Sequence, residues 1–178
     1  MQHFRVKIFA RTSDGFDLGN AIPAFHRWIQ RNALPELLVD VADYRHVPAG
    51  PGVLLVGHDS HYGLDQRGDR LGLLYVRRTA QDGTTSDRIR TAIAAARAAC
   101  DKLVQEPEFA GNLTFDSSEI EVSVNDRLLA PNNAESFAQL KSELVPVLDD
   151  VWGAGSYTAT HTGEPRDLLT VTARRSTC

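Results

Sequence analysis

The stretch that decides the fold of this chain is His46-Val-Pro-Ala-Gly-Pro-Gly-Val-Leu-Leu-Val-Gly-His-Asp-Ser-His-Tyr-Gly-Leu-Asp65. It begins with two prolines and two glycines before residue 53, a composition typical of a rigid surface turn. An apolar run follows, and five polar or titratable side chains then occupy residues 58–62. We interpret residues 52–62 as one strand that leaves the core and ends in a polar segment, which is either a solvated strand end or a site.

Two further apolar segments flank this strand, at residues 37–44 and 71–77. Gly68 and Asp69 supply a turn before the second of them. The three segments therefore predict an antiparallel meander. Residues 53–56 and 71–74 are apolar on both faces of their strands, so we expect the centre of the sheet to be covered on both sides.

The rest of the chain alternates between strand and helix patterns. Period-two alternation predicts strands at residues 4–10 and 120–124, and a hairpin formed by residues 157–161 and 168–173. Helical spacing of apolar residues predicts three main helices, of which the first is closed by Asn32 and Pro35, the second is capped by Ser86 and the third is opened by Asn133. Pro146 falls inside the third helix and should kink or split it.

These elements predict an α+β fold, with a mainly antiparallel sheet of about six or seven strands and three main helices packed on it. A chain of 178 residues fits one compact domain, residues 1–178. Its possible halves, 1–82 and 83–178, each contain a strand, a helix and further strands, which indicates a strand–helix–hairpin pseudo-repeat. We expect residues 174–178 to form a mobile tail.

Charge and cysteine content exclude several classes of partner. A net charge of −4 argues against nucleic acid as the main partner, because phosphate binding requires a basic surface. No apolar run approaches the ~20 residues that a membrane span needs. Two cysteines make no disulfide framework, which suits a reducing compartment. We expect a cytoplasmic protein that uses no cofactor and binds neither nucleic acid nor membrane.

His58 and His61 invite a metal interpretation, but strand geometry opposes it. Residues three apart in a strand point to opposite faces, so the two imidazoles would share an ion only across a bulge or at the strand end. In this register His58 shares a face with Ser60 and Tyr62, while Asp59 and His61 share the other. We therefore predict no metal site.

Asp40 interrupts an apolar strand and belongs to a second polar cluster, residues 40–46. If its face of the strand is buried, the carboxylate needs a partner, which Arg45 or a histidine could supply. If Asp40 instead neighbours His58 across the meander, the two become the best acid–base candidate in the chain. A structural ion pair or an exposed edge is the competing interpretation.

A third polar segment, residues 125–133, leaves a strand and ends at a helix N-terminus. Free backbone N–H groups there could hold an anion, and Arg127 could join them. In the competing interpretation, which we favour, Asp126 and Asn133 satisfy those groups themselves as turn and cap residues.

Four runs of this chain resemble those of a group of small, soluble bacterial proteins of similar length, to which no activity is attached. The runs are Phe25-His-Arg-Trp-Ile29, Val39-Asp-Val-Ala-Asp-Tyr-Arg-His-Val-Pro48, Gly57-His-Asp59 and Asn125-Asp-Arg-Leu-Leu-Ala-Pro-Asn132. The resemblance covers most of the chain. It implies a soluble bacterial protein and carries no ligand or catalytic residue with it.

Polar residues cluster in this chain, yet no reaction geometry can be assembled from them. We therefore infer a binding or assembly protein rather than an enzyme, with its recognition surface in residues 40–65 and either a partner protein or a second copy of the chain bound there. The binding residues we predict are Tyr44, Arg45, His46, His58, Asp59, Tyr62 and Arg127.

Two alternatives stay open. One is a small enzyme that uses Asp40 and His58, with or without His61, as an acid–base or metal site. The other is an anion-binding or metabolite-binding domain that uses the loop before Asn133.

Overall fold

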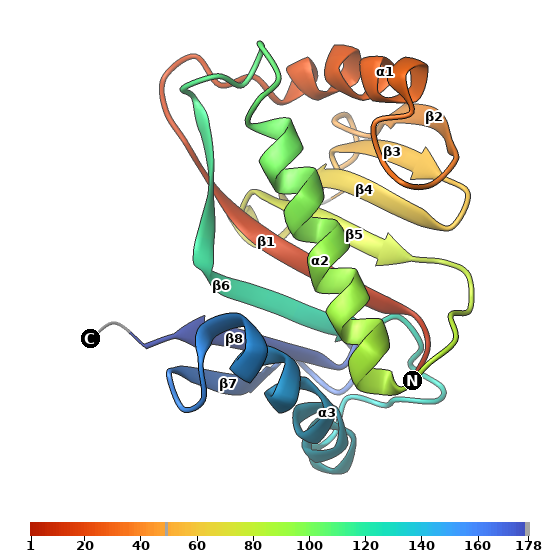
Figure 1. Cartoon of the computed structure of the whole chain (residues 1–178), viewed down its shortest axis with the longest axis vertical. Helices are drawn as coiled ribbons and strands as arrows, with labels where there is room; N and C mark the ends of the chain where they lie inside the picture. The colour runs from red at the N-terminus through yellow and green to blue at the C-terminus, as the bar shows by residue number, and fades with distance from the viewer. Residues whose placement is uncertain (49, 177–178) are drawn as a thin grey trace.

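Strand β1 (Phe4–Thr12) lies at the centre of an eight-stranded antiparallel sheet in the computed structural model of this chain, which describes residues 1–48 and 50–176. The strands follow the order β2-β3-β4-β5-β1-β6-β8-β7 across the sheet. Three helices pack on the sheet, as Figure 1 shows. The predicted α+β class is confirmed.

The sheet has eight strands rather than six or seven because residues 52–62 form a hairpin and not a single strand. His58 and Asp59 form the turn between its two strands. The Glu36 carboxylate accepts hydrogen bonds from the backbone N–H groups of Asp59 and Ser60, at 3.1 and 2.9 Å, and so stabilises the turn. The strands after β1 are β2 (Leu38–Asp43), β3 (Val53–Gly57), β4 (Ser60–Asp65), β5 (Gly72–Arg77), β6 (Leu113–Val124), β7 (Tyr157–Thr162) and β8 (Thr170–Arg175).

The two halves of the chain repeat one arrangement around the central β1–β6 pair. In the first half the last strand, β5, returns beside β1, and in the second half the last strand, β8, returns beside β6. Strands β1 and β6 pair with each other in antiparallel fashion. Helix α1 (Ala21–Arg31) follows β1 and helix α3 (Ala134–Trp152) follows β6. The topology therefore contains the expected pseudo-repeat, with two additional strands in the first meander.

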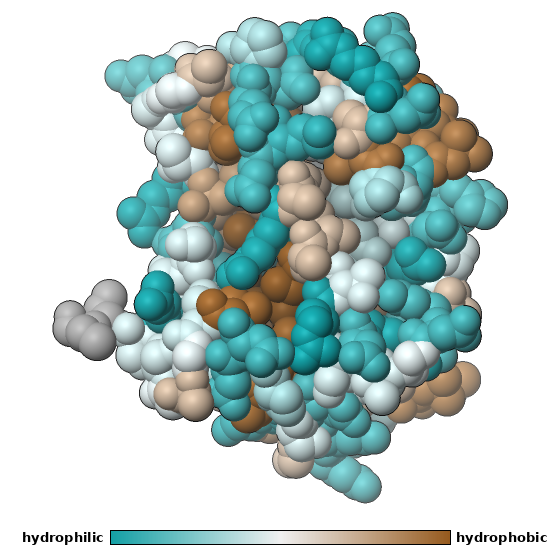
Figure 2. All heavy atoms as spheres, viewed as in Figure 1, coloured by the Kyte–Doolittle hydropathy of each residue, from teal (hydrophilic) through white to brown (hydrophobic). Residues whose placement is uncertain are grey.

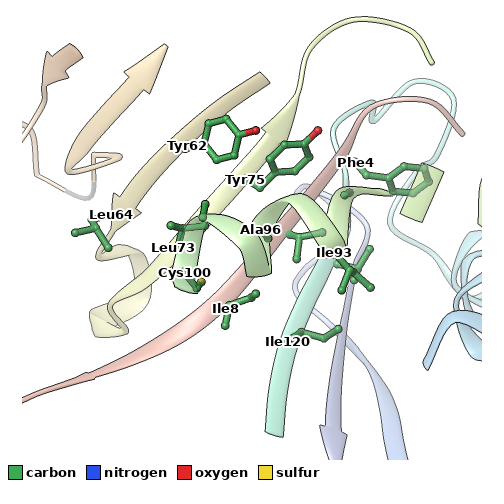
Figure 3. Packing of buried hydrophobic residues seen from close by; sticks show 14 of the residues in the cluster. Phe4, Ile8, Tyr62, Leu64, Leu73, Tyr75, Ile93, Ala96, Cys100 and Ile120 are labelled. Atoms are coloured by element: carbon green, nitrogen blue, oxygen red, sulfur yellow. The ribbon is translucent and has the colours of Figure 1, made fainter. Parts of the chain in front are cut away.

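All three helices cover the same face of the sheet (Figure 1). Phe4, Val6 and Ile8 of β1 form one apolar cluster with buried residues of α1, α3 and the intervening helix α2 (Thr85–Leu103). Figure 3 shows Ile93, Ala96 and Cys100 of α2 lying against this face of the sheet. The expectation of cover on both sides is wrong, because no helix of the described part of the chain lies on the opposite face, which we call the open face.

The open face nevertheless buries apolar groups. Phe9 and Leu74 are each 5% exposed and lie outside the core cluster under the helices. Long charged side chains cover the Phe9 ring: the Arg70 guanidinium carbon lies 3.5 Å from its centre and the Lys7 Nζ lies 5.7 Å from it. Long polar side chains can cover apolar surface in this way while their charged ends stay near water.

One expectation about the helices is corrected, and for another the structure excludes one of the two expected outcomes, the split at Pro146. Helix α2 is capped by Thr84 rather than Ser86: the Thr84 hydroxyl accepts the Asp87 N–H, and the Asp87 carboxylate accepts the Thr84 N–H. The Ser86 hydroxyl instead donates to the Glu143 carboxylate on α3, at 2.7 Å. Helix α3 runs through Pro146 without being split, because proline removes only one backbone hydrogen bond and the residues around it are firmly buried.

The second half of the sheet is longer at both ends than the sequence indicated. Strand β6 begins at Leu113 rather than at residue 120. Arg174 and Arg175 belong to β8 and not to a tail, and Arg174 forms an ion pair with Glu119 at 3.1 Å. Residues 177 and 178 of the expected tail lie outside the described residues.

Gly52 offers a test of the loop that enters β3. Its φ of +68° is left-handed, and a Cβ there would lie 2.0 Å from the Leu64 carbonyl oxygen. We expect Gly52→Ala to lower the free energy of unfolding by about 2–5 kcal/mol, because backbone strain and overpacking add. Gly68→Ala is the matched control, since Gly68 has a φ of +69° and open space around it. Equal losses in urea denaturation of the two variants would contradict the close contact.

Candidate functional site

Asp40 of β2 lies across from Val56, two residues before His58, but within the described residues no hydrogen bond joins the three acid–base candidates. Asp40 lies exposed on the edge strand β2, and its carboxylate accepts the backbone N–H of Val41 at 2.8 Å. His58 is exposed in the β3–β4 turn, and His61 is half-buried in β4. Burial and the nearby Arg78 charge lower the pKa of His61. Within the described residues, Asp40 and His58 share no hydrogen bond, and no group of three or more potential ligands could hold a metal ion.

The turn takes His58 and Asp59 out of the strand, whereas Ser60 and Tyr62 share one face of β4, as expected. Ser60 and Tyr62 point towards the helices: the Ser60 hydroxyl donates to the Tyr75 hydroxyl at 2.9 Å, and the Tyr62 hydroxyl donates to Glu36 at 2.7 Å. Tyr62 is only 3% exposed, and its burial raises its pKa. Tyr62 is therefore removed from the predicted recognition surface.

Residues 43–46 and Asp59 remain at the surface. Arg45 pairs with Asp43 at 2.7 Å and not with Asp40, and its hydrogen bonds to the Asp43 carboxylate lower the pKa of that group to about 2. Asp59 accepts the Thr79 hydroxyl at 2.7 Å. Tyr44 and His46 are exposed.

The loop before Asn133 does not present a free helix N-terminus. The Asn133 side chain accepts the Ser136 N–H at 2.9 Å, and Asp126 accepts the N–H groups of Leu128 and Leu129. The favoured interpretation of these residues as cap and turn is confirmed. Arg127 instead reaches the Arg166 carbonyl oxygen, at 3.0 Å, on the rim of a hollow in the open face.

This hollow, which we call the open-face hollow, is the strongest candidate site, and it has a volume of about 600 Å³. Its floor comes from the central strands, with Lys7 of β1, Asp65 of β4 and Glu121 of β6. Its rim comes from three loops that meet over the open face, around residues 67, 125–127 and 166–168. Five cations and three carboxylates line it: Arg5, Lys7, Arg67, Arg127 and Arg166, against Asp65, Glu121 and Asp167.

A buried ion pair forms the floor of the hollow. The Lys7 Nζ lies 2.9 Å from Asp65 Oδ2, and the two residues are 6% and 2% exposed. The Arg67 Nε donates to the second Asp65 oxygen at 2.8 Å. Burial would raise the pKa of Asp65, but the hydrogen bonds from Arg67 and Lys7 outweigh it and leave that pKa below its usual value. These three charges satisfy one another.

Arg5 lies beside this pair without a partner of its own. It is half-buried, and its Nε is buried without a hydrogen-bond partner among the described residues. Burial and the Arg67 charge lower the pKa of Arg5, but a guanidinium stays protonated in proteins. Arg127 and Arg166 on the rim likewise form no ion pair within the described residues.

Arginines elsewhere on the open face are paired, which sets Arg5 apart. Arg70 binds Glu119 through two hydrogen bonds of 2.9 and 2.8 Å, and Arg174 binds the same carboxylate. Arg11 binds Asp116 at 2.7 Å. Excess positive charge on this face is therefore concentrated in the open-face hollow.

Glu121 completes the floor and is also unusual. It lies directly across from Lys7 in the β1–β6 pair, yet its carboxylate forms no hydrogen bond within the described residues. Burial raises its pKa, although the Lys7 and Arg70 charges oppose this. A buried carboxylate without a hydrogen-bond partner lowers the stability of the folded protein. Such a group at the floor of a hollow is a candidate for function.

The sequence predicts Arg127 as a binding residue but does not indicate the other residues that line the hollow. The signal was the period-two alternation that places Arg5 and Lys7 on one face of β1 and Glu121 and Ser123 on the same face of β6. Charged residues on a central strand indicate a possible site. Whether these residues meet depends on which strands pair, and the alternation does not show this.

Comparisons of the chain with protein-family models, with curated proteins and with solved structures gave no match. None of the helices in residues 1–48 and 50–176 is long and apolar enough to cross a membrane. The candidate site therefore rests on its own geometry.

The raised pKa of Glu121 predicts a pH dependence of stability. The folded state binds a proton here more tightly than the unfolded chain, so this carboxyl lowers the free energy of unfolding as pH rises above its unfolded pKa of about 4.3. We expect Glu121→Gln to be more stable than the wild type at pH 7, with a difference that shrinks towards pH 4 and changes by no more than about 1.4 kcal/mol per pH unit.

Glu119→Gln is the matched control on the same strand and face. Arg70 lowers the pKa of Glu119, so its stabilising contribution is present above its unfolded pKa, and this variant should be less stable than the wild type at pH 7. Urea denaturation at a series of pH values measures both. A loss of stability in Glu121→Gln at pH 7 would show that its carboxylate is satisfied in the folded protein.

Proposed function

We propose that this protein binds a small organic anion in the open-face hollow. The observation that carries the proposal is the half-buried Arg5 guanidinium, which forms no ion pair within the described residues and whose buried Nε has no hydrogen-bond partner there. Buried charges in proteins are paired or bound to a ligand, because desolvation is otherwise too costly. A carboxylate or phosphate seated against Arg5 would supply the partner.

The shape and charge of the hollow support this function. Its volume of about 600 Å³ falls within the range of small-molecule sites, roughly 300–1,000 Å³. Cations outnumber carboxylates in its lining, and Arg127 and Arg166 stand on the rim where they would contact the same anion. Planar guanidinium groups suit two-point recognition of carboxylate and phosphate.

Binding is favoured over catalysis by the chemistry of the lining. Within the described residues it contains no histidine or cysteine, and its serine, Ser123, lies beside the Thr170 hydroxyl rather than beside a base. A nucleophile needs an adjacent general base. The sequence also indicates a binding protein, but it places the recognition surface in residues 40–65 rather than in the open-face hollow.

Arg5→Gln tests the proposal. Isothermal titration of the wild type with gluconate, hexanoate and inorganic phosphate should detect binding of at least one anion, and Arg5→Gln should weaken it by about 10- to 100-fold, because a charge-assisted hydrogen bond is lost. The variant should keep its stability, since Arg5 has no partner to lose. Arg90→Gln, which changes an exposed residue of α2 paired with Asp150 of α3, should bind like the wild type. Absence of binding by all three anions, or equal binding by both variants, would refute the proposal.

A second surface supports self-association, as one form of the recognition that we place in residues 40–65. Among residues 1–48 and 50–176, four of the six exposed large hydrophobic residues lie in or next to that segment: Leu37, Val39, Tyr44 and Val47. Figure 2 shows hydrophobic residues at the surface beside β2. A pocket of about 290 Å³ adjoins Tyr44 and Val47. The β2 bulge and the Asp40–Val41 hydrogen bond oppose backbone pairing at this edge, so we propose that side chains make the contact with a second copy.

Sedimentation velocity over a wide concentration range tests self-association. We expect a concentration-dependent dimer in the wild type and a monomer in the double variant Leu37→Ser/Val39→Ser, because the exposed apolar area is removed. The matched control is Leu128→Ser/Leu129→Ser, which changes the other exposed hydrophobic pair and should leave the dimer intact. A wild type that stays monomeric at every concentration would rule out this role.

A further inference from the structure

The part of the open-face hollow next to the arginines is lined by polar groups rather than apolar ones. Glu121, Ser123 and Asn125 follow one another at alternate positions along β6 and just beyond its end, and all three face the hollow. Within the described residues, Leu74 and Leu168 are the only apolar side chains in the lining. Small-molecule pockets are mostly apolar with a few polar groups, so this lining suits a ligand that is polar along its whole length.

These polar groups offer acceptors to a ligand more than donors. Thr170 donates its hydroxyl proton to the Leu168 carbonyl at 3.1 Å, so the proton between Ser123 and Thr170 comes from Ser123. Ser123 Oγ then keeps lone pairs but has no free proton. The Glu121 carboxylate and the Asn125 side-chain amide form no hydrogen bond within the described residues.

Acceptor groups beside an anion site constrain the ligand. Carboxylate and phosphate oxygens are themselves acceptors, so an anion alone would use the arginines and leave Glu121 and Ser123 unused. A ligand that fills the hollow must therefore bring hydrogen-bond donors as well as its negative charge.

Hydroxyl groups fit this requirement better than an ammonium group. The lining carries more positive than negative charge, which repels a cation. Asp65 is already bound by Lys7 and Arg67, and Asp167 accepts the Glu164 N–H at 2.8 Å, so neither is free for an ammonium. Glu121 is the one carboxylate of the lining without a hydrogen bond within the described residues, but the charges of Lys7, directly across from it, and of Arg70 would repel an ammonium there.

We infer that the ligand of the open-face hollow is a hydroxylated anion, such as a sugar acid or a sugar phosphate. Its charged group lies against Arg5, Arg127 and Arg166, and its hydroxyl groups donate to Glu121, Ser123 and Asn125. This inference rests on the proposed anion binding and specifies the class of molecule bound.

Three six-carbon carboxylates test the inference by isothermal titration. Gluconate carries five hydroxyl groups, hexanoate carries none, and 6-aminohexanoate carries an ammonium group at the far end. We expect gluconate to bind at least about tenfold more tightly than either of the others, since one good hydrogen bond to a charged group is worth this factor.

Variants of the residues that would accept hydrogen bonds from the ligand distinguish the inference of a hydroxylated anion from the proposal of anion binding. The double variant Glu121→Gln/Ser123→Ala should weaken gluconate binding by about tenfold and leave hexanoate binding unchanged. Hexanoate binding as tight as that of gluconate would overturn the inference while anion binding stands, and tightest binding of 6-aminohexanoate would assign an ammonium ligand instead. If none of the three binds, and inorganic phosphate does not bind either, anion binding itself fails. Equal binding of glucitol, the neutral sugar alcohol, would show that the hydroxyl groups alone are recognised.

Discussion

The ion pair between Lys7 and Asp65 is the interaction on which the open face depends. It joins β1 to β4 across the intervening β5, and Arg67 adds a second bond to the same carboxylate. Removing two charges from water is costly, and only close geometry offsets that cost. Lys7 also donates to the Arg67 carbonyl at 3.3 Å, so the pair holds the following turn as well as the strands. The ion pair at the floor of the hollow therefore also fixes the position of Arg67 on its rim.

Strand β1 divides the molecule chemically. Its side chains alternate between an apolar face under the helices and the charged open face, on which the described residues place no helix. On the charged face, Arg70 and Arg11 find carboxylates, whereas Arg5 does not. The charges at one end of this face are therefore paired, whereas the guanidinium at the other end has no ion-pair partner. A bound anion would stabilise that unpaired charge. We therefore place the proposed binding site at the unpaired end of this face rather than in the turn that contains His58.

The sequence predicts local features well and their convergence poorly. Alternation in residues 4–10 and helical spacing around Ile89 and Ile93 identify elements that the structure contains. The hairpin at His58 and Asp59 was missed because these residues do not form a typical two-residue turn sequence, and Glu36, far along the chain, stabilises it.

The hollow could not be predicted for a similar reason. Lys7 faces Glu121 only because β1 pairs with β6 in one register, and no local pattern encodes a pairing between residues so distant in sequence. Nor does alternation show which charged side chains will find partners: Arg5 and Arg70 look equivalent in the sequence, and only the packed sheet distinguishes them.

The position of β1 between β5 and β6 also bears on how the protein is made. The lining of the hollow includes residues 5 and 7 from the first strand, residues 121 and 123 from the sixth and residue 170 from the eighth. Contacts between such distant segments form slowly, because a long chain must first be brought together. During synthesis the ribosome must release every residue from 5 to 170 before this cavity exists. A nascent chain shorter than this has no complete hollow, so the proposed ligand could not stabilise it.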